Sequence, residues 1–141
     1  KIQFRPGTWF RYSAEGYNYL HHVVENITEQ RLDIYMRDAV LNPLGMNASI
    51  FTYTEAKELS VAMPHNEEGQ VVNKWLWRFQ KPMAAGTLFT TVTDYAHFLS
   101  AMLSTKESMQ SGSPQKLSAH DLEKMLHPQI EIGNQLAWSL G

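Results

Sequence analysis

The sequence contains no cysteine, no long hydrophobic run and no surplus of either charge. Among its 141 residues, 12 Lys and Arg stand against 14 Asp and Glu, which gives a net charge of −2. The missing cysteines exclude a disulfide framework, a cysteine-ligated metal and a thiol nucleophile. No apolar run approaches the ~20 residues that a membrane-spanning helix needs. The charge balance gives no reason to expect a nucleic-acid partner.

The sequence does contain enough apolar and aromatic residues for a hydrophobic core. Hydrophobic residues make up 43% of the chain and aromatic residues 11%. A chain of this composition and length is not expected to be disordered. The length itself predicts one domain rather than two.

The spacing of apolar residues predicts four helices, and therefore a mainly α fold. They lie at about residues 13–28, 32–41, 91–103 and 118–127. In the first helix, three- and four-residue steps place apolar side chains on one face, which we expect to be buried. That face comprises Tyr17, Leu20, Val23, Val24 and Ile27, and the opposite, polar face carries His21, Glu25 and Glu29.

Local signals predict where three of these helices begin or end. Thr91 with Asp94, and Ser118 with Asp121, have the spacing of a capping box, in which a hydroxyl bonds an amide of the first turn. Pro43 should end the second helix, because proline lacks the amide hydrogen and clashes with the previous turn. The third helix is expected to bury Val92, Tyr95, Phe98, Leu99, Met102 and Leu103.

Two further segments predict extended structure. Val61–Met63 and Val71–Val72 flank a polar stretch that ends in Gly69, which is typical of a hairpin. The tail, residues 129–141, is expected to form one strand of a sheet whose other strands lie outside this chain.

Histidines and carboxylates are the first candidates for a metal site or for acid–base chemistry. His21 and His22 are neighbours, so on a helix they point about 100° apart and cannot easily share an ion. The other four histidines are scattered, and no His-Glu-x-x-His spacing occurs. Capping and solubility explain the carboxylates. The sequence therefore predicts no metal and surface or half-buried histidines.

One short pattern fits a serine nucleophile. Ser113 and Lys116 match Ser-x-x-Lys. In enzymes that use this pair the serine opens a helix, which brings the lysine beside it. Here the pair lies in a Ser- and Gly-rich loop, so we attribute the match to chance.

Three blocks of residues carry a more specific signal together than any does alone. They are Phe4-x-Pro6-Gly7-x-x-Phe10-x-Tyr12-Ser13, then Val40-Leu41-x-Pro43-Leu44-Gly45-Met46, then Ala85-Gly86-x-Leu88-x-x-Thr91. Their order and spacing resemble the serine beta-lactamase-like hydrolases of the class C type, which include class C beta-lactamases, DD-peptidases and related esterases. The resemblance runs from Phe4 to about Trp138.

The resemblance implies a fold and a site. The fold would be the mainly helical inserted region of the beta-lactamase/DD-peptidase-like fold, with a short hairpin and a terminal strand. Tyr12 would be the tyrosine of the family's Tyr-x-Asn motif, which helps to move protons. Ala14 stands where class C beta-lactamases have Asn, which removes an amide that can bond the substrate. This disfavours efficient beta-lactam hydrolysis and favours a peptidase or an esterase.

The family's other two motifs are missing. Only eleven residues precede Tyr12, too few for the upstream Ser-x-x-Lys, and no Lys-Thr-Gly, Lys-Ser-Gly or His-x-Gly occurs. We therefore expect residues 1–141 to be a single helical region, a fragment of a larger serine hydrolase, and to be inactive alone. The absent sheet should leave apolar surface exposed, which predicts self-association.

The resemblance also implies the substrate class, the cofactor requirement and the location of the whole protein. Its substrate would be a small molecule or a peptide, no cofactor is needed, and family members are commonly exported. An alternative is a catalytically dead module that binds peptidoglycan-like peptides or a protein, which Ala14 favours. A free-standing helical interaction domain unrelated to hydrolases would require the three blocks to be coincidence.

Overall fold

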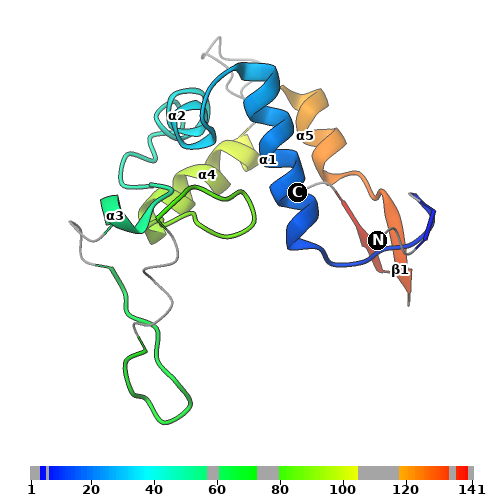
Figure 1. The fold of residues 1–141 in the computed structure, drawn as a ribbon. Helices are drawn as coiled ribbons and strands as arrows, with labels where there is room; N and C mark the ends of the chain where they lie inside the picture. Colours follow the sequence, from blue (N-terminus) through cyan, green and yellow to red (C-terminus); the bar gives the residue numbers. More distant parts are fainter. Residues whose placement is uncertain are drawn as a thin grey trace. The chain divides into compact units, whose positions relative to one another are not determined.

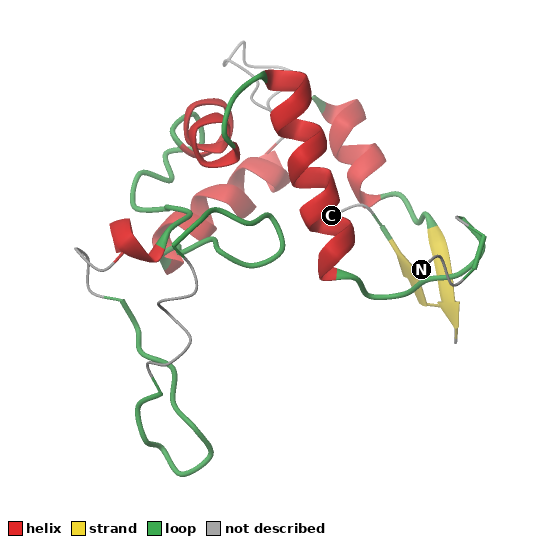
Figure 2. Ribbon diagram, viewed as in Figure 1, coloured by secondary structure: helices red, strands yellow, loops and turns green. Residues whose placement is uncertain are grey.

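The computed structural model describes residues 4–5, 7–56, 61–72, 80–104, 118–133 and 136–139. Figures 1 and 2 show that helix outweighs strand in this part of the chain, which confirms the mainly α prediction. The elements are α1 (Ala14–Thr28), α2 (Leu32–Met36), the π-helical turn η1 (Arg37–Leu41), α3 (Tyr53–Ala56), α4 (Val92–Ser104), α5 (Ala119–Leu126), β1 (Ile130–Gly133) and β2 (Leu136–Trp138).

The chain divides into two compact units. One combines Lys1–Ser13 with Leu99–Gly141, and the other is Ala14–Phe98. All four predicted helices are present with nearly the predicted bounds, and α3 was not predicted. Among the described residues, no helix is long and apolar enough to cross a membrane.

The second helix ends in a glycine-based cap. In η1 the amide of Asn42 donates to the carbonyl of Arg37 at 2.9 Å, and the helical assignment stops at Leu41, two residues before Pro43 as predicted. Gly45 then adopts a φ of +74°, and the amide of Met46 donates back to Leu41 at 2.8 Å. This bond with the left-handed glycine is the Schellman pattern, and its usual apolar contact is present because Leu41 and Met46 pack in one buried cluster.

That cluster is the core of the unit Ala14–Phe98. Leu41, Met46 and Phe51 are buried in it, and Met36, Leu44 and Phe98 pack against it. The core is therefore built from the end of the second helix, the turn after it and one face of α4.

A buried carboxylate ties the start of α4 to the turn at residues 46–50. Thr91 Oγ1 accepts the amide hydrogen of Asp94 at 3.1 Å, which confirms the predicted cap. The Asp94 carboxylate, in a residue only 5% exposed, accepts hydrogen bonds from the amide of Ala48 at 2.9 Å and from the hydroxyl of Ser49 at 2.7 Å. Ser49 also bonds the hydroxyl of Thr90 at 2.8 Å. Asp94 thus makes a local contact through its amide and long-range contacts through its carboxylate.

Two further contacts hold the same segments together. Ile50 and Phe89 exchange backbone hydrogen bonds at 2.9 and 2.8 Å, forming one antiparallel bridge. The Nδ1–H of His97 on α4 donates to the carbonyl of Gly45 at 3.0 Å. The buried hydroxyl of Thr87 closes the preceding loop by accepting the amide hydrogen of Met83 at 2.8 Å.

The predicted buried face of α1 is wrong for three of its five residues, while Val23 and Val24 are half-buried. Tyr17, Leu20 and Ile27 are exposed, Ile27 by 77%, whereas His21 is buried. Most of the apolar face predicted for α4 is also exposed, with Phe98 and Met102 half-buried. Periodicity finds the apolar face of a helix but not what covers it. In the described part of the chain, the core forms elsewhere and leaves these faces open.

The two extended segments differ from each other. Residues 61–72 form the predicted hairpin as a narrow loop with one bridge, between His65 and Val71, and Gly69 has a φ of +75° (Figure 1). The tail was expected to be a single strand with partners outside the chain, and this is wrong. It forms two antiparallel strands that pair with each other, Ile130 opposite Trp138, with a bulge between Glu131 and Gly133.

The Asp94 contact gives a stability prediction. We expect Asp94→Ala to lower the free energy of unfolding by about 2–3 kcal/mol, because the buried hydroxyl of Ser49 and the partly buried amide of Ala48 lose a charged acceptor. Asp121→Ala is a matched control at the other capping box, where Ser118 accepts the Asp121 amide at 3.0 Å at an exposed site. Its cost should stay below about 1 kcal/mol. Urea unfolding of both variants measures the difference, and equal costs would contradict the assignment.

The end of α1 gives a second prediction. Glu29, directly after α1, has a φ of +54°, which side chains with a Cβ rarely adopt. Glu29→Gly should raise the free energy of unfolding by about 0.5–1 kcal/mol, because glycine adopts this conformation without a steric cost. Glu29→Ala separates conformation from charge, since it removes the carboxylate from the helix C-terminus and keeps the Cβ. If alanine stabilises as much as glycine, the helix dipole and not the backbone is responsible.

Candidate active site

Tyr12 lies in a short irregular segment that leads from a turn to α1. The amide and hydroxyl of Thr8 both donate to the carbonyl of Arg5, at 3.3 and 2.6 Å. Gly7 within this turn has a φ of +81°, the value that a type II turn requires at its third position. Tyr12 follows, 75% exposed, two residues before α1 begins. Its phenol is therefore open to solvent.

One aromatic contact joins this segment to the C-terminal hairpin. The rings of Phe10 and Trp138 lie 4.8 Å apart between centroids, tilted by 33°. Trp138 is held in turn by its backbone, because its carbonyl accepts the amide hydrogen of Gln129 at 2.7 Å and its Cα pairs with Ile130. Phe10 and Trp138 lie near opposite ends of the sequence, so no spacing pattern predicts their contact.

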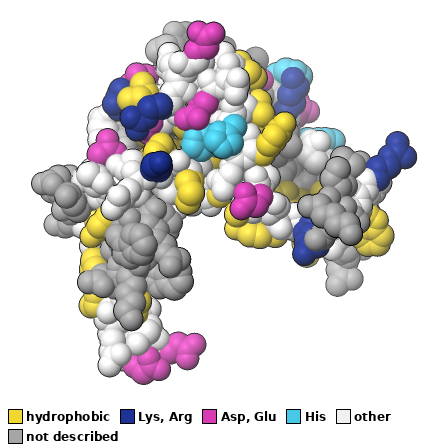
Figure 3. Space-filling view, in the orientation of Figure 1, with side chains coloured by type: hydrophobic (Ala, Val, Ile, Leu, Met, Phe, Trp, Pro, Cys, Tyr) yellow, Lys and Arg dark blue, Asp and Glu magenta, His cyan; other side chains and the backbone are white. Residues whose placement is uncertain are grey.

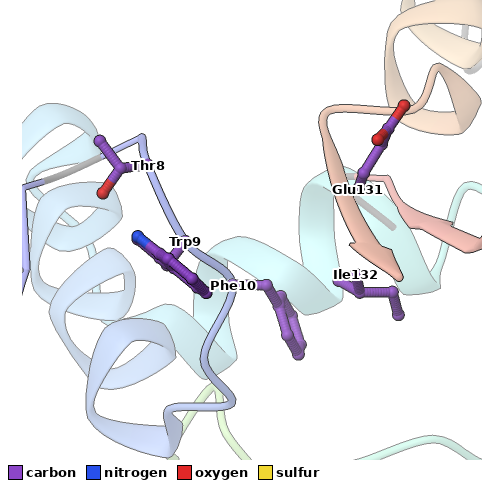
Figure 4. Close-up of a pocket in the computed structure, with 5 residues that line it drawn as sticks. All are labelled: Thr8, Trp9, Phe10, Glu131 and Ile132. Atoms are coloured by element: carbon purple, nitrogen blue, oxygen red, sulfur yellow. The ribbon is translucent and has the colours of Figure 1, made fainter.

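A groove of about 400 Å³ opens between the same segment and β1. Thr8, Trp9 and Phe10 line one side, and Glu131 and Ile132 line the other (Figure 4). Glu131 and Ile132 project in opposite directions from β1, as neighbours on a strand do. The walls are mainly apolar and aromatic, with one carboxylate.

The other residues singled out from the sequence are Ala14, Ser113 and Lys116. Ala14 is the exposed first residue of α1, two positions after Tyr12 in the sequence. Ser113 and Lys116 lie outside the described residues.

His21 and His22 make contacts with Glu25 and with each other. His21, only 8% exposed, donates from Nε2 to Glu25 Oε1 at 3.0 Å. His22 stacks on His21 with 5.2 Å between ring centroids, and its Nδ1 lies 3.9 Å from Glu25. Figure 3 shows histidine side chains next to hydrophobic ones on the surface over α1. In the described part of the chain, no group of three His, Asp or Glu side chains is placed to hold a metal ion.

Glu25 connects α1 to α2. Its Oε1 accepts the amide hydrogen of Leu32, the first residue of α2, at 3.0 Å. This backbone bond, followed by the bond from His21, holds the pKa of Glu25 below its ordinary value. Both donors favour the ionised carboxylate. His21 was predicted on the polar outer face, and this is wrong, because it is buried with its ring bonded to Glu25.

Comparison with known proteins identifies the family. A family model described as Beta-lactamase matches residues 1–141. This chain therefore belongs to the Beta-lactamase family, and the resemblance to serine beta-lactamase and DD-peptidase-like proteins is confirmed.

Individual relatives agree with this assignment. The chain is 26% identical over 113 residues to "Protein flp" of Staphylococcus aureus (strain MW2), which covers 79% of this chain and 22% of that protein. It is 38% identical over 60 residues to "Penicillin-binding protein 4" of Amycolatopsis lactamdurans, covering 43% and 16%. The structure of the octameric penicillin-binding protein homologue from Pyrococcus abyssi matches with a TM-score of 0.78 and 25% identity, covering 97% and 30%. The chain thus spans less than a third of each relative.

The pKa of Glu25 gives a pH prediction. A carboxylate with a lowered pKa in the folded state adds stability above its unfolded pKa and loses it as pH falls through the folded pKa. Thermal unfolding should therefore show wild type losing its advantage over Glu25→Gln as pH falls below about 4.5, the ordinary value. The two melting temperatures should converge in acid. A constant difference across pH 3–6 would show that the bonds of Glu25 do not depend on its charge.

Proposed function

We propose that this chain is the tyrosine-bearing helical region of a serine hydrolase that cleaves an amide or ester through an acyl-enzyme. The observation that carries the proposal is the match of residues 1–141 to the Beta-lactamase family. The assignment of Tyr12 to the family tyrosine comes from the resemblance of its sequence segment and is part of the proposal. The exposure of Tyr12 supports it, because a phenol must reach the reacting atoms to move a proton.

The proposed reaction has two halves. A serine hydroxyl supplied by another part of the protein attacks the carbonyl carbon, and its proton leaves as the oxyanion forms. The leaving amine or alcohol departs with a proton, and water then releases the acyl group from the serine. Tyr12 would carry the proton between the serine oxygen and the leaving group. A phenol serves as a base when a positive charge lies beside it, which the family's lysine would provide.

Ala14 bears on the substrate. It offers a methyl group where class C beta-lactamases offer an amide, so one donor and one acceptor for the substrate are missing. We infer that D-alanyl peptides or esters fit this protein better than beta-lactams do.

The alternative is a member of the fold that binds peptides without cleaving them. Ala14 favours this alternative, because a binding module does not need the amide of the family motif. The two proposals differ in whether a Ser-x-x-Lys precedes Tyr12 in the gene.

The hydrolase proposal is tested by covalent labelling. Intact-mass spectrometry before and after treatment with a penicillin or a phosphonate probe should show one adduct on the complete polypeptide that carries this chain. The 141-residue chain alone should show none, because it has no Ser-x-x-Lys upstream of Tyr12. Tyr12→Phe in the complete polypeptide should lower the acylation rate by about 10²–10⁴-fold, the usual contribution of a positioned acid or base.

Two outcomes would contradict this assignment. A complete polypeptide that takes no adduct would favour the binding module. Hydrolysis by the 141-residue chain that Tyr12→Phe abolishes would show that this chain has its own nucleophile.

Exposed apolar surface also leads us to propose self-association. Trp9, Leu136 and Trp138 are all exposed in the unit that carries Tyr12. The structurally similar protein from Pyrococcus abyssi is described as octameric, which is compatible with this proposal. Sedimentation velocity of the 141-residue chain over a hundredfold concentration range should show dimers or larger species at the upper end, because apolar patches drive association. A monomer at every concentration would count against it.

A further inference from the structure

The segment that carries Tyr12 leads from a local turn to α1. The turn fixes its beginning through the bonds of Thr8 to Arg5. The side chains of Trp9 and Tyr12 beyond the turn are exposed. A side chain that packs against a regular element restrains the position of such an irregular segment.

The Phe10–Trp138 contact supplies that restraint. Trp138 lies 126 residues beyond Tyr12 in the sequence, and the ring contact joins the Tyr12 segment to β2. A distance of 4.8 Å between the centroids lies in the range that aromatic pairs favour. Phe10 lies two residues before Tyr12, so fixing the Phe10 ring limits the positions that the Tyr12 backbone can reach.

The hairpin is a suitable anchor because Trp138 is fixed at its backbone. The bond from the Gln129 amide and the pairing with Ile130 hold β2 against β1. Leu136 lies on the same face of β2, two residues away, because side chains alternate along a strand. Trp138 contacts the Tyr12 segment through its ring, which packs on Phe10.

We propose that Phe10 and Trp138 are positioning residues for Tyr12, and that their contact sets where the phenol stands during acyl transfer. The expected effect of these two residues on catalysis rests on the proposed function. The restraint itself is a property of this chain and is measured without any activity.

The first test uses the 141-residue chain. The backbone ¹⁵N order parameter of Tyr12, assigned by comparison with Tyr12→Phe, should lie near ~0.85 in wild type, as in rigid backbone. In Trp138→Leu it should fall below ~0.6, the flexible range. Trp138→Phe keeps an aromatic ring and should restore it. Leu136→Ala, on the same face of the same strand, should leave it unchanged. An order parameter that does not respond to Trp138→Leu would overturn the proposal.

The second test measures turnover in the complete polypeptide that carries this chain. Trp138→Leu should lower kcat by about tenfold to a hundredfold with little change in KM, because a displacement of about 1 Å at a reacting group costs up to 10²-fold in rate. Phe10→Leu should have the same effect, and the double variant should lose no more than either single variant. Trp138→Phe should recover most of the rate.

The outcomes separate this proposal from the proposed function. If Tyr12→Phe abolishes turnover while Trp138→Leu leaves kcat within about twofold, Tyr12 acts in catalysis and the positioning role is wrong. If Tyr12→Phe has no effect on turnover, the role of Tyr12 fails, and the order parameter still decides whether Trp138 restrains it. Thermal unfolding of each variant identifies any that fail to fold, and Phe10→Leu then replaces Trp138→Leu in both measurements.

Discussion

The Asp94 carboxylate accepts hydrogen bonds from the Ala48 amide and the Ser49 hydroxyl, which joins the start of α4 to a segment 46 residues earlier in the chain. A carboxylate this well buried is costly unless donors surround it, so its position requires that turn to stay in place. The Ile50–Phe89 bridge and the His97–Gly45 bond act between the same two segments. Together these contacts close the space in which Leu41, Met46 and Phe51 are buried.

Local structure could be predicted from the sequence because its causes are local. The two capping boxes, the end of the second helix at Leu41 and the hairpin before Val71 depend on residues a few positions apart. The second role of Asp94 could not be predicted, because its partners Ala48 and Ser49 are far away in the sequence. Burial was wrong where it depended on covering elements: Ile27 is exposed and His21 is buried.

The candidate site shows the same division. Tyr12 is singled out by resemblance to a family, and the structure shows it exposed, after the turn at Gly7. The contact between Phe10 and Trp138 could not be predicted from spacing, because it joins the two ends of the chain. Trp138 stands opposite Ile130 because β2 pairs with β1. The prediction of one strand for the whole tail does not contain this pairing.

The bonds of Glu25 depend on the charge of the group that accepts them. The Glu25 carboxylate loses its charge in acid, and with it the strength of its bonds to Leu32 and His21. The amide of Leu32 is the first of α2, so acid should loosen the junction of α1 and α2 at that residue.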